Sequence, residues 1–216
     1  MLRETWDTRP ITLLSAWWRV WSSAWARGAV RAWMRAHVPR EFAVAHAAPT
    51  GEVVVELLEH LSTHGYLMTL DFSKAFDCLD PLVAHEVLIH LGWTCDLVDV
   101  LVTVWNDQQR WVSFQSHIHP LTVSGPSMPQ GDPLGPVIMT ISAWLGWCQV
   151  ERSCRPDPHF MSRVYVDDRS FASSRAWSIH DRFHAWSAWS TSVGLLESNA
   201  KPRRLALEGA PAAPVP

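Results

Sequence analysis

The sequence predicts an α+β fold in which an antiparallel sheet packs on helices. The first observation is an apolar segment at residues 67–71, short enough for a buried strand. The second is two pairs of segments with alternating apolar and polar residues, which indicate two hairpins. The third is the order strand, helix, hairpin, helix, hairpin, helix, which is typical of α+β domains. With 48% hydrophobic residues among 216, the chain is able to bury a core.

The N-terminal part is predicted to be helical and is rich in tryptophan. Trp17, Trp21 and Trp25 recur at four-residue steps with Trp33 on the same face, so we expect this face in the core. The opposite face carries four arginines: Arg19, Arg27, Arg31 and Arg35. The pattern leaves open whether they are simply solvated or face phosphate groups. Residues 36–50, rich in Ala, Pro and His, are predicted to form a loop.

Further helices are indicated between this region and the first hairpin. Residues 51–63 are predicted to form one helix. Its inward side chains are expected to be Val55, Leu58 and Leu61. Asp80 followed by Pro81 predicts a helix start, because Asp is a common N-cap and Pro is favoured at the first helical position. This helix is expected to end before Gly92, and another is expected over residues 96–106.

The second half of the chain contains the hairpins and two more helices. The predicted hairpins comprise residues 110–115 with 121–124, and residues 163–166 with 170–173. Asp167 and Asp168 stand at the turn of the second one. The uncharged run at 133–150 contains Pro, Gly and polar residues, which favours a buried helix over a membrane span. A last helix is expected to end at Gly194, and residues 209–216 are predicted to be disordered.

Charge and cysteine usage narrow the functional classes. The net charge of −3 argues against a strongly basic nucleic-acid binder. The first 50 residues nevertheless carry seven arginines and three acids, whereas residues 51–100 are acidic. This distribution suits a nucleic-acid surface beside a metal site, and it also suits ordinary surface charge. The four cysteines lack paired metal-site spacing and no signal peptide is visible, so we expect reduced thiols in an intracellular protein.

Three short stretches carry the candidate chemistry. They are Leu70-Asp71-Phe72-Ser73-Lys74-Ala75-Phe76-Asp77, Pro129-Gln130-Gly131-Asp132-Pro133-Leu134-Gly135-Pro136 and Val164-Tyr165-Val166-Asp167-Asp168-Arg169. A two-metal polymerase needs one carboxylate at a strand end and a pair on a neighbouring hairpin, to hold two ions roughly 3.5–4 Å apart. In this order the stretches resemble motifs A, B and C of the palm domain of reverse transcriptases, closest to those of retrotransposons without long terminal repeats.

The resemblance implies an RNA-directed DNA polymerase with two Mg²⁺ ions, or Mn²⁺ in their place. It implies that Asp71, Asp167 and Asp168 are catalytic metal ligands, with the backbone carbonyl of Phe72 as a further ligand. Carboxylate oxygens are ligands that Mg²⁺ prefers. The implied partners are an RNA template with a DNA primer and deoxynucleoside triphosphates, and no membrane.

Other positions match the family's nucleotide-binding residues. The resemblance implies that Phe76 is the steric gate that excludes a ribose 2′-hydroxyl, and that Gln130 and Gly131 contact the incoming nucleotide. Gly135 departs from the family, which commonly has Ser there. Arg9, in Arg9-Pro10-Ile11, resembles a fingers residue that holds triphosphate. Lys201, in Asn199-Ala200-Lys201, resembles the motif D lysine that protonates pyrophosphate.

The resemblance also predicts a domain organisation. Residues 1–66 are expected to form a partial helical fingers region, 67–208 a palm, and 209–216 a tail. No thumb or endonuclease segment is recognised, which leaves three readings open: a fragment of an element, a decayed copy, or a domain that takes these functions from a partner chain. Two alternatives stay open: an inactive retroelement remnant that binds nucleic acid or another protein, and an RNA-directed RNA polymerase, against which the bulky Phe76 argues. The cellular compartment, cytoplasm or nucleus, is also open.

Overall fold

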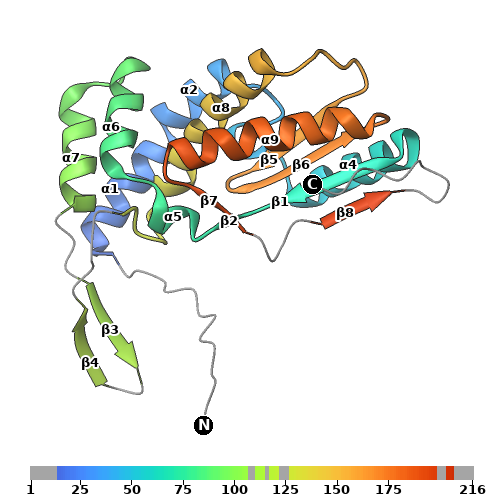
Figure 1. The fold of residues 1–216 in the computed structure, drawn as a ribbon. Coiled ribbons are helices and arrows are strands. Elements are labelled where there is room, and N and C mark those ends of the chain that lie inside the picture. Colours follow the sequence, from blue (N-terminus) through green and yellow to red (C-terminus); the bar gives the residue numbers. More distant parts are fainter. Residues whose placement is uncertain (1–13, 107–109, 115–116, 122–126, 199–202, 207–216) are drawn as a thin grey trace, which may run out of the picture.

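A computed structural model describes residues 14–106, 110–114, 117–121, 127–198 and 203–206 (Figure 1). The helices are α1 (Ala16–Arg27), α2 (Ala29–His37), α3 (Ala43–His46), α4 (Thr50–His64), α5 (Ala75–Cys78), α6 (Pro81–His90), α7 (Cys95–Asn106), α8 (Gly135–Ser153) and α9 (Ala176–Ser192). The strands are β1 (Tyr66–Leu70), β2 (Phe72–Ser73), β3 (Arg110–Phe114), β4 (His117–Leu121), β5 (Met161–Tyr165), β6 (Asp168–Ser173), β7 (Leu196–Glu197) and β8 (Arg203–Ala206). The predicted α+β class is confirmed.

The central sheet has the strand order β5-β6-β1-β8, and each neighbouring pair is antiparallel. Strand β1 is therefore internal, flanked by β6 and β8. Two smaller pairs accompany this sheet: β2 with β7 and β3 with β4. The short β2–β7 pair continues directly from the end of β1, so the segment after β1 is tied to a strand from near the end of the described chain.

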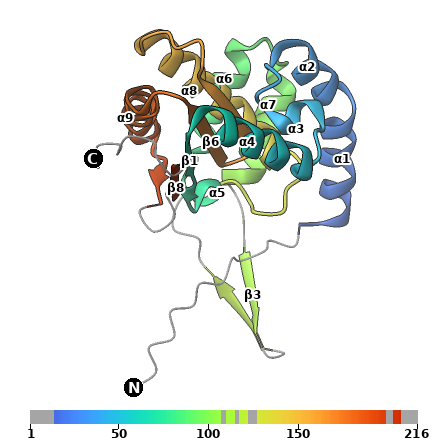
Figure 2. The ribbon, with the colours of Figure 1, turned by 90° about the vertical axis from the view of Figure 1, so that its right-hand side faces the viewer.

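Successive side chains of β1 point to opposite faces of the sheet, and helices cover each face. Leu67 joins Val53 and Leu57 of α4 in one hydrophobic cluster. Its neighbours in β1, such as Met68, belong to the main core together with α8 and α9, because successive strand residues point to opposite faces. In Figure 2, α4 and α9 lie on opposite sides of the strands. The sheet is thus covered by helices on both faces.

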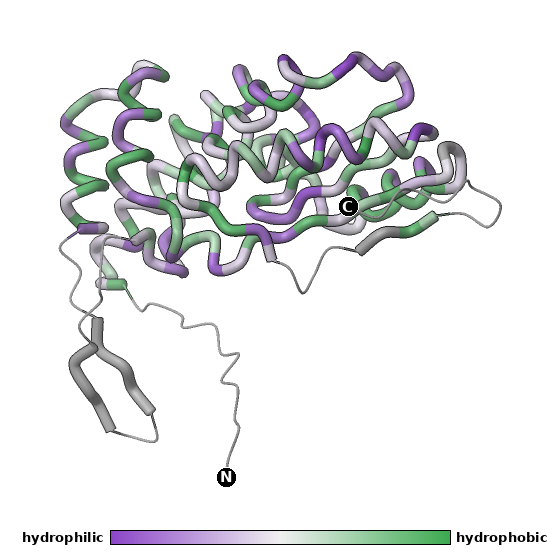
Figure 3. Tube along the Cα trace, in the orientation of Figure 1, coloured by the Kyte–Doolittle hydropathy of each residue, from purple (hydrophilic) through white to green (hydrophobic). Residues whose placement is uncertain are grey.

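Helices α6 and α7 form an antiparallel pair beside the main core (Figure 1). The side chain of Asp80 accepts a hydrogen bond of 2.8 Å from the backbone N–H of Leu82, and Pro81 opens α6, so the predicted helix start is confirmed. Hydrophobic and hydrophilic residues alternate along both helices in Figure 3. The buried residue Trp105 near the end of α7 reaches toward the segment before α8.

The prediction that the tryptophan face is buried is wrong for Trp17, whereas Trp21, Trp25 and Trp33 are partly buried and pack against the main core. Gly28 separates the N-terminal region into α1 and α2, and Trp17 is 87% exposed. The inward face of α1 is centred on Trp18 and the fully buried Ser22, with Trp21 and Trp25 beside them. Because Trp occurs at both 17 and 18, hydrophobic periodicity alone was compatible with either face.

Two further expectations are corrected. The helix predicted over 51–63 is present as α4, but Val55 and Leu58 are both 54% exposed, and Val53 and Leu57 are buried in their place. A long apolar stretch gives a weak periodicity, so the sheet decides which side is inward. Within the predicted loop 36–50 the short helix α3 forms; the Ala45 N–H donates a hydrogen bond of 3.0 Å to the Phe42 carbonyl.

The remaining predicted elements are confirmed, with one shift. In the first hairpin the second strand is His117–Leu121 rather than 121–124, and residues 122–126 lie outside the described residues. The apolar helix after residue 133 is α8, buried among the other helices. None of the described helices is long and apolar enough to cross a membrane. The predicted tail 209–216 also lies outside the described part of the chain.

Candidate active site

The end of β1 brings Asp71 beside the second hairpin. Leu70 pairs with Arg169 in the antiparallel β1–β6 ladder, so the next step of the same register sets Asp71 opposite Asp168. The backbone carbonyl of Asp71 accepts a hydrogen bond of 2.9 Å from the N–H of Ser198. Of the three candidate metal ligands, Asp71 therefore directly follows β1 and Asp168 begins the adjacent strand β6, at one end of the sheet.

The third aspartate stands in the turn between β5 and β6. Tyr165 pairs with Asp168, which leaves a two-residue loop of Val166 and Asp167. Val166 has a positive φ of 59°, and Asp167 is not among the residues with positive φ, as in a type II′ turn. A β-branched residue in this conformation is strained, and such strain gathers at functional sites. The turn holds Asp167 next to Asp168 and near the end of β1.

Phe76 lies between the end of β1 and the start of α8. Its backbone carbonyl accepts a hydrogen bond of 3.1 Å from the N–H of Met128. A Cβ atom at Gly135 would lie 3.2 Å from Cε1 and 3.5 Å from Cδ1 of the Phe76 ring. The departure from Ser at position 135 thus has a physical counterpart, because the phenylalanine ring occupies the space that a side chain would need.

Gln130 and Gly131 lie in the turn that precedes α8. Gly131 is exposed and has φ of 116°, a backbone conformation that residues with a Cβ rarely adopt. Asp132 next to it is 2% exposed. Its carboxylate accepts hydrogen bonds from the indole N–H of Trp18 (2.7 Å) and of Trp105 (2.9 Å), and from the Leu134 N–H (2.9 Å). The turn is therefore anchored to both α1 and α7.

The groups expected to bind magnesium are three carboxylates and one backbone carbonyl. Asp71, Asp167 and Asp168 supply carboxylate oxygens, and Phe72 supplies a backbone carbonyl, which are donors that suit Mg²⁺. Among the described residues, no three His, Cys, Asp or Glu side chains form a group placed to hold a metal ion. These residues are brought to one end of the sheet by the pairing of the strands, and their side chains do not form a completed metal-ligand group.

Two predicted site residues, Arg9 and Lys201, lie outside the described residues. Sequence reasoning missed two others, Asp132 and Arg169, which are 2% and 0% exposed. Arg169 follows the aspartate pair, and the alternation of β6 places its side chain opposite to that of Asp168. This alternation was the available signal for an inward-facing arginine.

Cys78, at the end of α5, is a titratable group close to this region whose pKa is perturbed. Burial raises the pKa of its thiol; the neighbouring Asp77 raises it further, and Lys74 opposes the change. The thiol donates a hydrogen bond to the carbonyl oxygen of Ser73, which lies 3.5 Å from Sγ. The thiol is therefore held in its neutral, weakly nucleophilic form.

A cavity of about 390 Å³ lies between α1, α2 and the turn before α8. Its lining includes the arginines Arg19, Arg27 and Arg31, together with Gly131 and Pro133. No Asp or Glu occurs among the lining residues, and none of the three arginines has an ion-pair partner within the described ranges. We call this cavity the arginine groove; its uncompensated positive charge suits a phosphate group.

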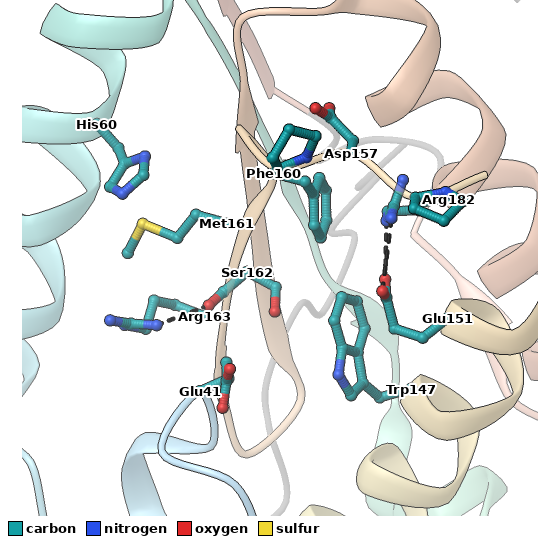
Figure 4. Close-up of a pocket in the computed structure, with 12 residues that line it drawn as sticks. Glu41, His60, Trp147, Glu151, Asp157, Phe160, Met161, Ser162, Arg163 and Arg182 are labelled. Carbon is teal, nitrogen blue, oxygen red and sulfur yellow. Dashed lines mark hydrogen bonds and ion pairs between the residues drawn. The ribbon is translucent and has the colours of Figure 1, made fainter. Parts of the chain in front are cut away.

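A second cavity, of about 630 Å³, lies at the opposite end of β5 (Figure 4). Arg182 and Arg163 point into it from α9 and β5, but they pair with Glu151 at 2.8 Å and with Glu56 at 2.6 Å. The guanidinium carbon Cζ of Arg182 also lies 4.0 Å from the centre of the Phe160 ring. The arginines of this second cavity therefore form ion pairs with neighbouring side chains, unlike those of the arginine groove.

Comparison with known proteins supports the fold. No protein-family model matches the sequence, and no curated protein matches it. Solved telomerase structures do match. The apo enzyme of Candida tropicalis, truncated from its C-terminal domain, has a TM-score of 0.64 and 12% identity over 90% of this chain and 42% of that one. Telomerase of Candida albicans, in complex with a fragment of telomeric RNA, has a TM-score of 0.62 and 12% identity over 87% and 34%.

These matches show that the chain shares the fold of part of these telomerase structures, which is a reverse-transcriptase-like fold. The chain spans less than half the length of the telomerase chains, 42% and 34% in these two cases. The predicted palm-type α+β class is consistent with the matches. The narrower likeness to retrotransposons without long terminal repeats is not supported by them, since the neighbours are telomerases.

Proposed function

We propose that this chain is the palm and part of the fingers of an RNA-directed DNA polymerase. The observation that supports the proposal is the pairing of Leu70 with Arg169: Asp71 directly follows the one, Asp168 directly precedes the other, and Asp167 stands in the adjoining turn. In this proposal these three carboxylates and the Phe72 carbonyl would hold two Mg²⁺ ions. Bound there, the ions would lower the pKa of a primer 3′-hydroxyl and stabilise the leaving pyrophosphate.

The protein's own groups would position the nucleotide and the template. Phe76 would stand against the sugar and exclude a 2′-hydroxyl, and the lack of a side chain at Gly135 leaves room for its ring. Gln130 and Gly131 would contact the nucleotide, since the exposed glycine allows close backbone approach. The arginine groove adjoins this turn and would bind phosphates of the RNA template.

The remaining assignments extend this proposal. Residues 1–66 would act as fingers and 67–208 as palm, with Arg9 on the triphosphate and Lys201 as the proton donor to pyrophosphate. The substrates would be deoxynucleoside triphosphates, a DNA primer and an RNA template. Telomerase of Candida albicans, one of the structural neighbours, was solved with a fragment of telomeric RNA, which supports nucleic acid as the partner class.

The test is primer extension on an RNA template with the purified chain, in Mg²⁺ and then in Mn²⁺. Extension by the parent and its loss in Asp167→Asn are expected, because the amide lacks the charge that a metal requires. Asp96→Asn, an exposed carboxylate in the first turn of α7, is the matched control and should retain activity. No extension by a folded parent chain would contradict the proposal and favour a non-catalytic nucleic-acid-binding protein.

Sugar selection separates a DNA polymerase from an RNA polymerase. The parent should incorporate deoxynucleotides in preference to ribonucleotides, and Phe76→Ala should relax this preference by removing the ring. Equal use of both sugars by the parent would contradict the steric role of Phe76.

A further inference from the structure

We propose that Arg169 is a positioning residue, which holds the Phe72 carbonyl and the Asp168 carboxylate in a fixed relation. The inference rests on the proposed function, because it concerns the same metal-binding groups. Arg169 would not touch metal or substrate itself. Its action would pass through Glu197 and the aromatic ring of Phe72.

Arg169 is a fully buried cation that forms two hydrogen bonds with one carboxylate. It is 0% exposed, although it directly follows the exposed Asp168 in β6. Its Nη1 and Nη2 donate hydrogen bonds of 2.8 and 2.7 Å to Oε1 and Oε2 of Glu197. The fork of arginine matches a carboxylate in this way and fixes orientation as well as distance. The hydroxyl of Ser190 donates a third bond of 2.9 Å to Glu197.

The same guanidinium group covers an aromatic ring of the site. Its central carbon lies 3.5 Å from the ring centroid of Phe72, and 5.2 Å from that of Trp186. A planar guanidinium stacks favourably on an aromatic face. Arg169 therefore contacts β2 through Phe72 and β7 through Glu197 with one side chain.

Backbone pairing links the same segments that the Arg169 side chain contacts. Phe72 pairs with Glu197 between β2 and β7, and the Asp71 carbonyl accepts a hydrogen bond from the Ser198 N–H. Arg169 pairs with Leu70 between β6 and β1. The chain from Leu70 to Phe72 is thus linked to Arg169 on both sides, by the β1–β6 ladder and by the side chain that reaches Glu197.

Stability alone does not account for this arrangement. Replacing a buried ion pair by apolar residues of similar size is often neutral or stabilising, because burial costs both charges their hydration. The Nε atom of Arg169 is buried and has no hydrogen-bond partner among the described residues, which adds to that cost. What an apolar pair would not supply is the directional link among β6, β7 and β2.

The test compares Arg169→Met, Arg169→Lys and the paired Arg169→Met/Glu197→Leu variant with the parent. The first variant leaves a buried carboxylate alone and should lower the melting temperature. The paired variant should recover it, because no buried charge remains. Amide hydrogen exchange should nevertheless accelerate at Phe72 and Ser198 in the paired variant, while exchange in β1 at Met68 stays at the parent rate.

Metal binding provides the second readout. Titration with Mn²⁺ should show an affinity weaker by about tenfold or more in the paired variant, a loss typical for residues that orient metal ligands. Arg169→Lys keeps the positive charge but loses the two-donor guanidinium group. Its Mn²⁺ affinity should lie between those of the parent and the paired variant.

The outcomes separate the two proposals. Parent-like exchange at Phe72 and Ser198 together with parent-like Mn²⁺ affinity would overturn the positioning role. Accelerated exchange with weakened Mn²⁺ binding would support it, even if no variant extends a primer. In that case the polymerase proposal, and not the positioning of these groups, would be at fault.

Discussion

The indole Nε1 of Trp105 donates a hydrogen bond of 2.9 Å to Oδ2 of Asp132, which joins α7 to the turn before α8. Trp18 of α1 donates to the same oxygen at 2.7 Å. With the Leu134 N–H on Oδ1, the carboxylate has three donors in a buried setting. Asp132 is thus a structural anchor of the turn that carries Gln130 and Gly131.

Asp132→Asn should lower the free energy of unfolding by about 1–3 kcal/mol, because the new amide NH₂ is itself a donor and would face at least one of these N–H donors. Denaturant unfolding measures this loss. Asp96→Asn, at an exposed position on α7, is the control and should change stability little. Equal stability of the parent and Asp132→Asn would show that the three donors do not depend on the carboxylate.

Gly135→Ser should destabilise the protein by about 1–2 kcal/mol, because its Cβ would press on the Phe76 ring, 3.2 Å away. Phe76→Leu should relieve this contact. A double-mutant cycle on unfolding free energies should therefore show favourable coupling between the two substitutions. Additive effects would mean that the ring moves aside freely.

Gly146→Ala should weaken the packing of α8 on α9 by about 1–3 kcal/mol. Its Cβ would stand 2.6 Å from Cδ2 and Cε3 of Trp189, which is 7% exposed and has little room to move. Gly51→Ala is the matched control in α4, where nothing lies within 4 Å. This control should stabilise the protein by up to about 1 kcal/mol. Thermal unfolding of both variants checks the contrast, and an equal change in both would contradict it.

Arg27→Gln and Arg31→Gln should weaken RNA binding and make it less sensitive to salt. Each lost phosphate contact should reduce the slope of log affinity against log salt by about 0.7 for a single strand. Arg35→Gln is the control, since Arg35 lies on α2 but does not line the arginine groove. Fluorescence anisotropy across a salt series measures the slopes. Parent-like slopes for the groove variants would place the RNA elsewhere.

Asp157 should make stability depend on acid pH. Burial would raise the pKa of this carboxyl, but hydrogen bonds from Ser178, Ser173 and the His159 N–H, and the charge of Arg175, outweigh it and hold the pKa below its usual value. A carboxyl with a lowered folded pKa stabilises the protein above its unfolded pKa, and this stabilisation fades as the pH falls through the folded pKa.

Unfolding of the parent and of Asp157→Asn across a series from neutral to strongly acidic pH checks this linkage. The variant should be less stable near neutrality, and the difference should shrink below about pH 4, the usual range for Asp. A difference that stays constant over the whole range would show that the carboxyl charge is not the cause.

Local signals in the sequence were sufficient for most elements. Asp80 and Pro81 marked the start of α6 because capping depends on the residues at the helix end itself. The alternation around Asp167 and Asp168 marked the hairpin for the same reason, since a turn is a local structure. The order of the predicted strands, hairpins and helices was enough to predict the α+β class, which the structure and its telomerase neighbours bear out.

Only the tertiary structure decided which surfaces are inside and which residues meet. Trp17 and Trp18 are neighbours in sequence, yet Asp132, far along the chain, draws Trp18 inward and leaves Trp17 exposed. Arg169 and Glu197 likewise find each other through two strands of different sheets. A periodic pattern describes one element at a time, whereas burial and pairing arise from elements distant in the chain, and so the sequence alone determined the segments and the structure determined their contacts.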